Sequence, residues 1–246
     1  APIAAAHGAD LLTLDADGCG TFRDLCDAQS DTFVAEARDD DDLAALLYTS
    51  GTTGRSKGAM LTHGNLLSNA EVLAREWRFA PDDVLLHALP IFHTHGLFVA
   101  TNVALLGGAS MLFLPGFDPE AILRLLPRAT VLMGVPTFYT RLLADPRFDR
   151  ASASRIRLFV SGSAPLLAET HIAFEARTGH RILERYGMTE TNMNTSNPYD
   201  GDRRAGTVGR PLPGIEVIVT DPATGAPLPT GETGVVEVRG PNVFKG

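Results

Sequence analysis

Short apolar runs alternate with longer segments of helical periodicity along most of this 246-residue chain. Such alternation is typical of βαβ units, in which parallel strands form one sheet and the connecting helices cover its faces. The runs that predict strands are residues 43–48, 84–89, 110–114, 131–134, 156–161 and 182–184. The segments that predict helices are residues 65–77, 96–106, 119–126, 136–143 and 166–178. We therefore predict an α/β fold with a mostly parallel sheet and flanking helices.

The composition changes along the chain and predicts three segments. Residues 1–42 are rich in Ala and Asp with weak periodicity, and we expect linker and edge structure there. Residues 43–202 carry the strand–helix alternation and should form the central α/β subdomain. From residue 203 on, Gly and Pro separate short β-rich runs, so residues 203–246 should start a small β-rich subdomain.

Charge, cysteine content and hydropathy exclude several classes of function. The formal charge of −8, from 21 basic and 29 acidic residues, argues against nucleic-acid binding. Cys19 and Cys26 are too few for a disulfide framework, so we expect free thiols in a reducing cytoplasm. The most apolar region, residues 97–114, is interrupted by polar residues and Gly, which favours a buried helix, turn and strand over a membrane span. We expect small-molecule partners, without nucleic acid or membrane.

A dense string of glycines and hydroxyl residues, T-S-G-T-T-G-R-S-K-G at 49–58, follows the first predicted strand. Its glycines permit close approach of the backbone, its N–H groups can donate to an anion, and Lys57 adds a positive charge. The string differs from the P-loop of NTPases, because Gly51 and Gly54 are only three apart and Gly58 follows the lysine. It predicts a phosphate-binding loop, and a polar surface turn is the alternative.

Two further strings could contribute to the same site. In Y-G-M-T-E-T at 186–191, Tyr186 offers an aromatic face to a flat base and Thr189 a hydroxyl. Glu190 beside a triphosphate would require a cation such as Mg²⁺ between the two negative groups. In S-G-S-A-P-L at 161–166, small residues could leave a slot for a planar ring. Taken alone, each string is better explained by ordinary capping and turn chemistry.

The order and spacing of these strings closely resemble the adenylate-forming superfamily of acyl-CoA synthetases, adenylation domains and luciferases. The signature Y-T-S-G-T-T-G-x-x-K-G stands at 48–58, the adenine-side motif at 162–165 and Y-G-x-T-E at 186–190. The segment L-P-I-F-H-T-H-G at 89–96 resembles the one beside the acyl and pantetheine pocket. The motifs G-T-V-G-R-P at 206–211 and G-E-T-G at 231–234 match later family motifs, so the resemblance covers about residues 43–246.

The resemblance implies an ATP-dependent acid–thiol ligase that uses ATP, Mg²⁺ and coenzyme A. A carboxylate would attack the α-phosphorus of ATP and expel pyrophosphate, and the thiol of coenzyme A would then displace AMP. Lys57, Thr189 and Glu190 would be the catalytic residues, with Glu190 holding Mg²⁺. The implied ATP-binding residues are Thr49, Ser50, Gly51, Thr52, Thr53, Gly54, Lys57, Gly162, Ser163, Ala164, Pro165, Tyr186, Gly187, Met188 and Thr189.

The amino-acid sequences of two segments most resemble those of the malonyl-CoA synthetases, which act on malonate and often methylmalonate. These segments are P-I-F-H-T-H-G-L-F at 90–98 and M-G-V-P-T-F-Y-T-R-L-L at 133–143. The implied acid-binding residues are His93, Arg141 and Ser163, with Arg141 on the distal carboxylate. An arginine can hold a carboxylate bidentately, although on residue chemistry alone a solvated helix position fits Arg141 somewhat better.

Three alternatives stay open: another acyl-CoA ligase, a carrier-loading adenylation domain, and a catalytically silent nucleotide-binding fragment. The family's ribose-binding aspartate, its hinge and the lysine of its small C-terminal domain would lie beyond Gly246. We therefore expect residues 1–246 alone to make little or no thioester, and the C-terminal domain of the same protein to be a partner of this segment.

Overall fold

The computed structural model describes residues 2–49 and 57–246. It forms two compact units, Ala1–Arg38 and Asp39–Gly246. The first unit contains the short helices α1 (Pro2–Ala6) and α2 (Thr21–Asp27), neither of which buries a residue. The predicted boundary after residue 42 lies close to this division. The predicted boundary at residue 203 falls inside the second unit and stays a prediction.

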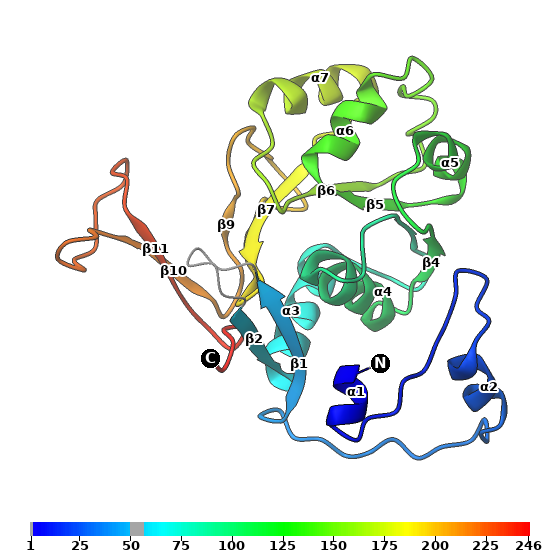
Figure 1. The fold of residues 1–246 in the computed structure, drawn as a ribbon. Helices are drawn as coiled ribbons and strands as arrows, with labels where there is room; N and C mark the ends of the chain where they lie inside the picture. The colour runs from blue at the N-terminus through cyan, green and yellow to red at the C-terminus, as the bar shows by residue number, and fades with distance from the viewer. Residues whose placement is uncertain (1, 50–56) are drawn as a thin grey trace. The chain divides into compact units, whose positions relative to one another are not determined.

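A seven-stranded sheet in the order β4-β3-β5-β6-β7-β8-β9 forms the centre of the second unit (Figure 1). Neighbouring strands from β4 to β7 are parallel, whereas β8 and β9 are antiparallel additions. The prediction of an α/β fold with a mostly parallel sheet is confirmed. The strands are β3 (Val84–His87), β4 (Ser110–Phe113), β5 (Val131–Gly134), β6 (Leu158–Ser161), β7 (Leu183–Met188), β8 (Asn192–Ser196) and β9 (Arg210–Pro211).

Helices cover both faces of this sheet (Figure 1). One face carries α3 (His63–Glu76), the π-helix η1 (His95–Thr101) and α4 (Asn102–Leu106). The other carries α5 (Pro119–Leu125), the 3₁₀ helix η2 (Leu126–Arg128), α6 (Pro136–Leu143) and α7 (Ala168–Thr178). None of the helices within residues 2–49 and 57–246 has the length and apolarity needed to cross a membrane.

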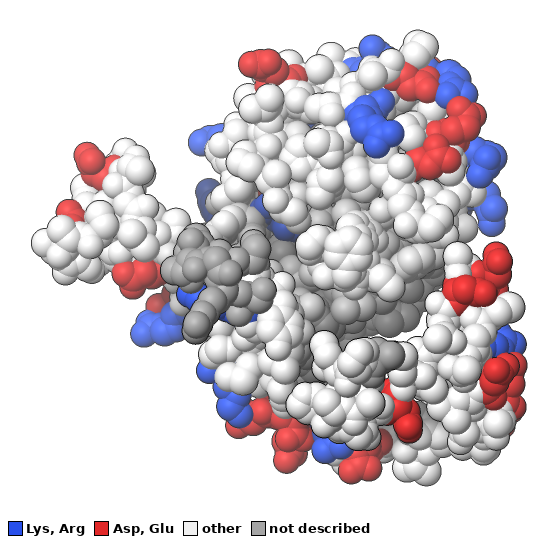
Figure 2. All heavy atoms as spheres, in the orientation of Figure 1, with Lys and Arg blue, Asp and Glu red and all other residues white. Residues whose placement is uncertain are grey.

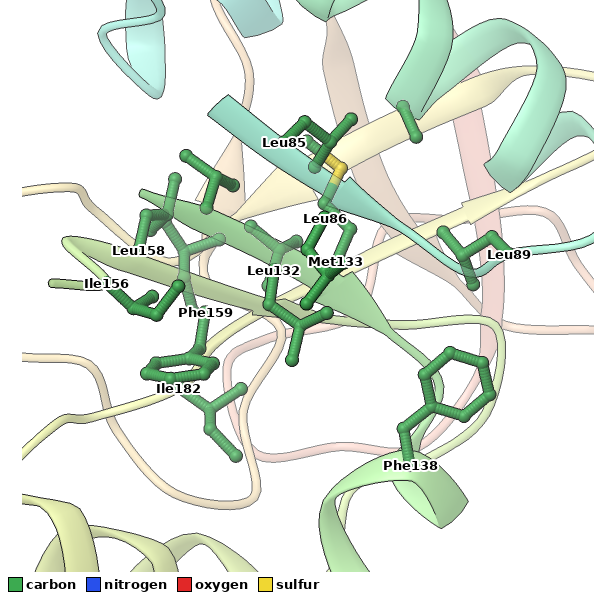
Figure 3. Packing of buried hydrophobic residues seen from close by; sticks show 14 of the residues in the cluster. Leu85, Leu86, Leu89, Leu132, Met133, Phe138, Ile156, Leu158, Phe159 and Ile182 are labelled. Carbon is green, nitrogen blue, oxygen red and sulfur yellow. The ribbon is translucent and has the colours of Figure 1, made fainter. Parts of the chain in front are cut away.

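The apolar core lies between the sheet and these helices. Side chains of β3, β5 and β6 pack together on both faces of the sheet, and Phe138 of α6 lies at one end of the cluster (Figure 3). Because both faces are covered, these strands are continuous apolar runs, which is why they could be predicted from sequence. Basic and acidic side chains lie together at the surface around α5 (Figure 2). In this region Arg147, which follows α6, pairs with Glu120 of α5 and with Asp145.

Two hairpins stand apart from the main sheet. Strand β1 (Leu43–Thr49) pairs antiparallel with β2 (Lys57–Thr62), and β10 (Glu216–Thr220) pairs with β11 (Val235–Arg239). The interpretation of residues 43–48 as a buried strand was wrong, because Leu43 and Leu46 are about half exposed. A strand paired on one edge alone, outside the central sheet, is not covered on both faces as the core strands are. The second hairpin falls in the segment that was predicted to be β-rich.

The amino ends of three neighbouring parallel strands are held together by Asp83, which directly precedes β3. Its carboxylate accepts hydrogen bonds from the Arg157 guanidinium (2.5 and 2.7 Å) before β6 and from the Thr130 hydroxyl (2.7 Å) before β5. Burial alone would raise the pKa of Asp83, but these hydrogen bonds and that of the Ala80 N–H outweigh it and lower the pKa. Asp83 is therefore charged, and its hydrogen bonds hold the amino ends of β3, β5 and β6 together.

Replacing Asp83 with Asn should cost about 2–3 kcal/mol of stability, because it leaves the partly buried guanidinium of Arg157 without its anion. Urea unfolding of the whole protein measures this, with Asp82→Asn at the exposed neighbouring position as the control. A carboxyl with a lowered folded pKa stabilises the protein above its unfolded pKa, and this contribution is lost as the pH falls through the folded value. The difference between the parent and Asp83→Asn should therefore shrink in acid. A cost equal to that of Asp82→Asn would contradict the role of this ion pair.

Candidate active site

A pocket of about 410 Å³ opens where four neighbouring strands end. Its walls come from the segments after β3, β5 and β6 and from the hairpin β7–β8. In open α/β sheets, ligands bind in crevices at the carboxyl ends of the strands. The lining residues are Leu89, Pro90, His93, Thr94, His95, Gly96, Val135, Ser163, Arg185, Gly187, Met188, Thr189, Glu190 and Met193.

The pocket brings together residues from three of the strings that sequence analysis singled out. They come from positions almost 100 residues apart, and the strand order places them side by side. The predicted site residues that line the pocket are His93, Ser163, Gly187, Met188, Thr189 and Glu190.

Other predicted site residues lie outside this lining, and their roles stay predictions. Arg141 is exposed on α6, with its guanidinium carbon 4.6 Å from the centre of the Phe117 ring. Thr49 ends β1 and the exposed Lys57 begins β2. Gly162, Ala164 and Tyr186 are chain neighbours of lining residues, and Pro165 lies two positions after Ser163. None of these four residues lines the pocket itself. Ser50, Gly51, Thr52, Thr53 and Gly54 lie outside the described residues.

The motif at 186–190 lies on a β-hairpin, in which a turn at residues 189–191 joins β7 to β8. Strand β8 has the polar sequence N-M-N-T-S and is nevertheless buried along its whole length. The Asn69 side chain explains this burial, since it donates to the Met193 carbonyl (2.7 Å) and accepts from the Met193 N–H (3.1 Å). The turn is therefore held on a well-packed strand.

Glu190 lies in this turn, half-buried at the pocket wall next to Thr189. Its backbone carbonyl accepts a hydrogen bond from the Phe244 N–H (2.8 Å), which ties the turn to the end of the chain. A single carboxylate with a neighbouring hydroxyl fits Mg²⁺, which proteins bind through one or two carboxylates together with substrate phosphates. The donor set at this wall of the pocket is thus compatible with the predicted magnesium ion.

Arg185 is the pocket residue that sequence reasoning missed. Its side chain comes from β7 and is 2% exposed, and its Nε and Nη2 atoms are buried without a hydrogen-bond partner. Burial lowers the pKa of Arg185 to about 9, so the guanidinium is still charged at neutral pH. Within the described part of the chain, it makes no ion pair with a carboxylate. Because an unpaired buried charge is costly, an anionic ligand is the expected partner.

A buried histidine and a strained serine lie beside this cation. His95 Nδ1 lies 3.2 Å from the Ser163 hydroxyl. Burial, and then the charge of Arg185, lower the pKa of His95 well below its usual value, so the imidazole is neutral. Ser163 has φ of 70°, a left-handed conformation that non-glycine residues seldom adopt outside functional sites. The pocket therefore combines a cation, a hydroxyl and a neutral imidazole, a set that can hold a carboxylate.

Known proteins resemble this chain over most of its length. The profile of the AMP-binding enzyme family matches residues 4–246. A malonate–CoA ligase of Arabidopsis thaliana is 38% identical over 95% of this chain and 40% of its own length. The crystal structure of ATP-bound MatB from Rhodopseudomonas palustris is 64% identical, with a TM-score of 0.97, and the match covers 100% of this chain and 49% of MatB. The structure of a malonyl-CoA ligase ternary product complex with methylmalonyl-CoA and AMP is 44% identical, with a TM-score of 0.77, over 86% of this chain and 46% of that one. The chain spans less than half the length of each of these proteins.

Proposed function

Because this chain belongs to the AMP-binding enzyme family, we propose that the whole protein is an ATP-dependent acid–thiol ligase that converts malonate or methylmalonate to its coenzyme A thioester. The observation that carries this proposal is the buried, unpaired guanidinium of Arg185 in the pocket. A fatty acyl chain would leave that charge without a partner, whereas a dicarboxylate supplies one. The similarity to malonate–CoA ligases supports the same substrate class.

The proposed reaction has two displacements. A carboxylate oxygen of the acid bonds to the α-phosphorus of ATP as the bond to pyrophosphate breaks. The thiol of coenzyme A then loses its proton and its sulfur bonds to the acyl carbon, as the bond between that carbon and the oxygen of AMP breaks. Neither step needs a redox group, so the protein contributes positioning and charge neutralisation. Mg²⁺, when bound, supplies positive charge to the phosphates, and Glu190 with Thr189 would hold it.

The acid itself would be held by its distal carboxylate. We propose that Arg185 pairs with the distal carboxylate and that Ser163, fixed by its contact with His95, donates to it. His93 would line the remaining wall of the acid site. The sequence-based proposal that Arg141 holds the distal carboxylate stands as the alternative, although its side chain lies over Phe117.

The remaining expectations rest on the family. The phosphate-loop and adenine-side residues would bind ATP, and the C-terminal domain of the same protein would complete the second step. We propose a cytoplasmic location from the exposed free thiols of Cys19 and Cys26. Acid-dependent exchange of pyrophosphate into ATP tests the proposed function: malonate should support it, and a preference for a monocarboxylate would overturn the assignment.

A further inference from the structure

We propose that Gly162 determines acid specificity, because its missing side chain leaves the space in which the Arg185 guanidinium lies. This inference rests on the proposed function, in which Arg185 holds the distal carboxylate. It differs from the adenine-side role that the family resemblance implies for Gly162.

The two residues face each other across neighbouring strands. Ser161 of β6 is the register partner of Glu184 of β7, so Gly162 and Arg185 come next on the two strands. A Cβ built on Gly162 would lie within 3.0 Å of three guanidinium atoms, among them Nε at 2.6 Å. Real Cβ atoms essentially never approach other heavy atoms so closely. Any side chain at position 162 would therefore displace the guanidinium.

The backbone itself does not require glycine at this position. Gly162 does not have a positive φ, so an L-residue could adopt its conformation. Its neighbour Ser163 has the left-handed conformation and is nevertheless not glycine. Space for Arg185, and not backbone freedom, is thus the physical reason for glycine at position 162.

The surroundings keep the guanidinium in this space. Burial raises the pKa of Tyr139, and the phenol hydroxyl donates to the Val160 carbonyl (2.5 Å), so Tyr139 is a neutral neighbour. His95 is neutral as well. No anion among these neighbours draws Arg185 elsewhere, so its position depends on packing. Because the contact is with the end of a flexible side chain, a methyl group at position 162 should move the guanidinium without unfolding the sheet.

A double-mutant cycle on the purified whole enzyme tests the proposal. Gly162→Ala should lower kcat/KM for malonate by at least about 30-fold more than kcat/KM for butyrate, mainly through KM for malonate. In an Arg185→Ala background, adding Gly162→Ala should change malonate kcat/KM by less than about threefold, since no guanidinium remains to be displaced. Gly116→Ala, a glycine with no atom near its Cβ position, is the matched control.

Other outcomes would overturn the proposal. Gly162 acts on the nucleotide if Gly162→Ala raises KM for ATP and lowers kcat/KM for malonate and butyrate in parallel. The same conclusion follows if its effect on malonate kcat/KM persists in the Arg185→Ala background. A crystal structure of Gly162→Ala gives a readout that does not depend on the substrate. A displaced guanidinium supports the proposal, and an unmoved one refutes it. Failure of the parent enzyme to activate malonate would refute the proposed function and leave this structural test intact.

Discussion

Glu190→Gln in the whole protein should lower the rate of acid-dependent ATP–pyrophosphate exchange. The expected loss of transition-state stabilisation is about 2–4 kcal/mol. The amide has nearly the shape of the carboxylate, so packing in the turn between β7 and β8 is kept. What is lost is the negative charge that would hold Mg²⁺ against the phosphates of ATP. Initial exchange rates at several Mg²⁺ concentrations measure the effect, and the defect should be largest at low Mg²⁺.

Glu232→Gln is the control for this substitution, because Glu232 is an exposed carboxylate in the loop between β10 and β11. It should keep both the exchange rate and the thermal midpoint of the parent. If Glu190→Gln exchanges at nearly the rate of the parent at both limiting and saturating Mg²⁺, Glu190 does not hold the metal ion.

Arg185→Ala should lower kcat/KM for malonate, because it leaves the distal carboxylate in a buried pocket without its cation. The loss should correspond to about 2–5 kcal/mol of binding free energy in the transition state. Butyrate has no distal carboxylate and should lose much less. The ratio of kcat/KM for malonate and butyrate is therefore the quantity to measure. A parallel loss for the two acids would mean that Arg185 supports the fold and not the recognition of the acid.

Arg141→Ala is the matched substitution for the same measurement. The side chain of Arg141 packs over Phe117 outside the pocket lining, so this change should alter the malonate-to-butyrate ratio far less than Arg185→Ala does. If Arg141→Ala lowers the ratio steeply and Arg185→Ala does not, the sequence-based assignment of Arg141 is the correct one.

The core strands could be predicted because their environment is uniform along the strand. Strands β5 and β6 are covered on both faces, so their residues are apolar throughout and the runs at 131–134 and 156–161 are visible in the sequence. Strand β8 was missed because its polar residues are buried by long-range hydrogen bonds. Asn242 donates to the side-chain oxygen of Asn194 (3.0 Å) from 48 positions away, and such a partner leaves no local pattern.

Only part of the candidate site could be predicted, because some of its residues form a contiguous motif and others depend on distant partners. Thr189 and Glu190 belong to a contiguous motif and could be assigned from sequence, and the structure places them at the pocket. Arg185 adjoins that motif, and the only signal was the charged pair Glu184 and Arg185 directly after the apolar residues Ile182 and Leu183. Its burial depends on the absence of a side chain at Gly162 on the neighbouring strand, which no property of residues 183–188 reveals.

Acid-dependent exchange of labelled pyrophosphate into ATP by the purified whole protein tests the central claim most directly. The acids to compare are malonate, methylmalonate, acetate, butyrate and a long-chain fatty acid. A site built around a buried cation should favour malonate or methylmalonate over butyrate by at least about tenfold. Fastest exchange with butyrate or the fatty acid would contradict the dicarboxylate site, and ATP binding without exchange for any acid would show a silent nucleotide-binding protein instead of a ligase.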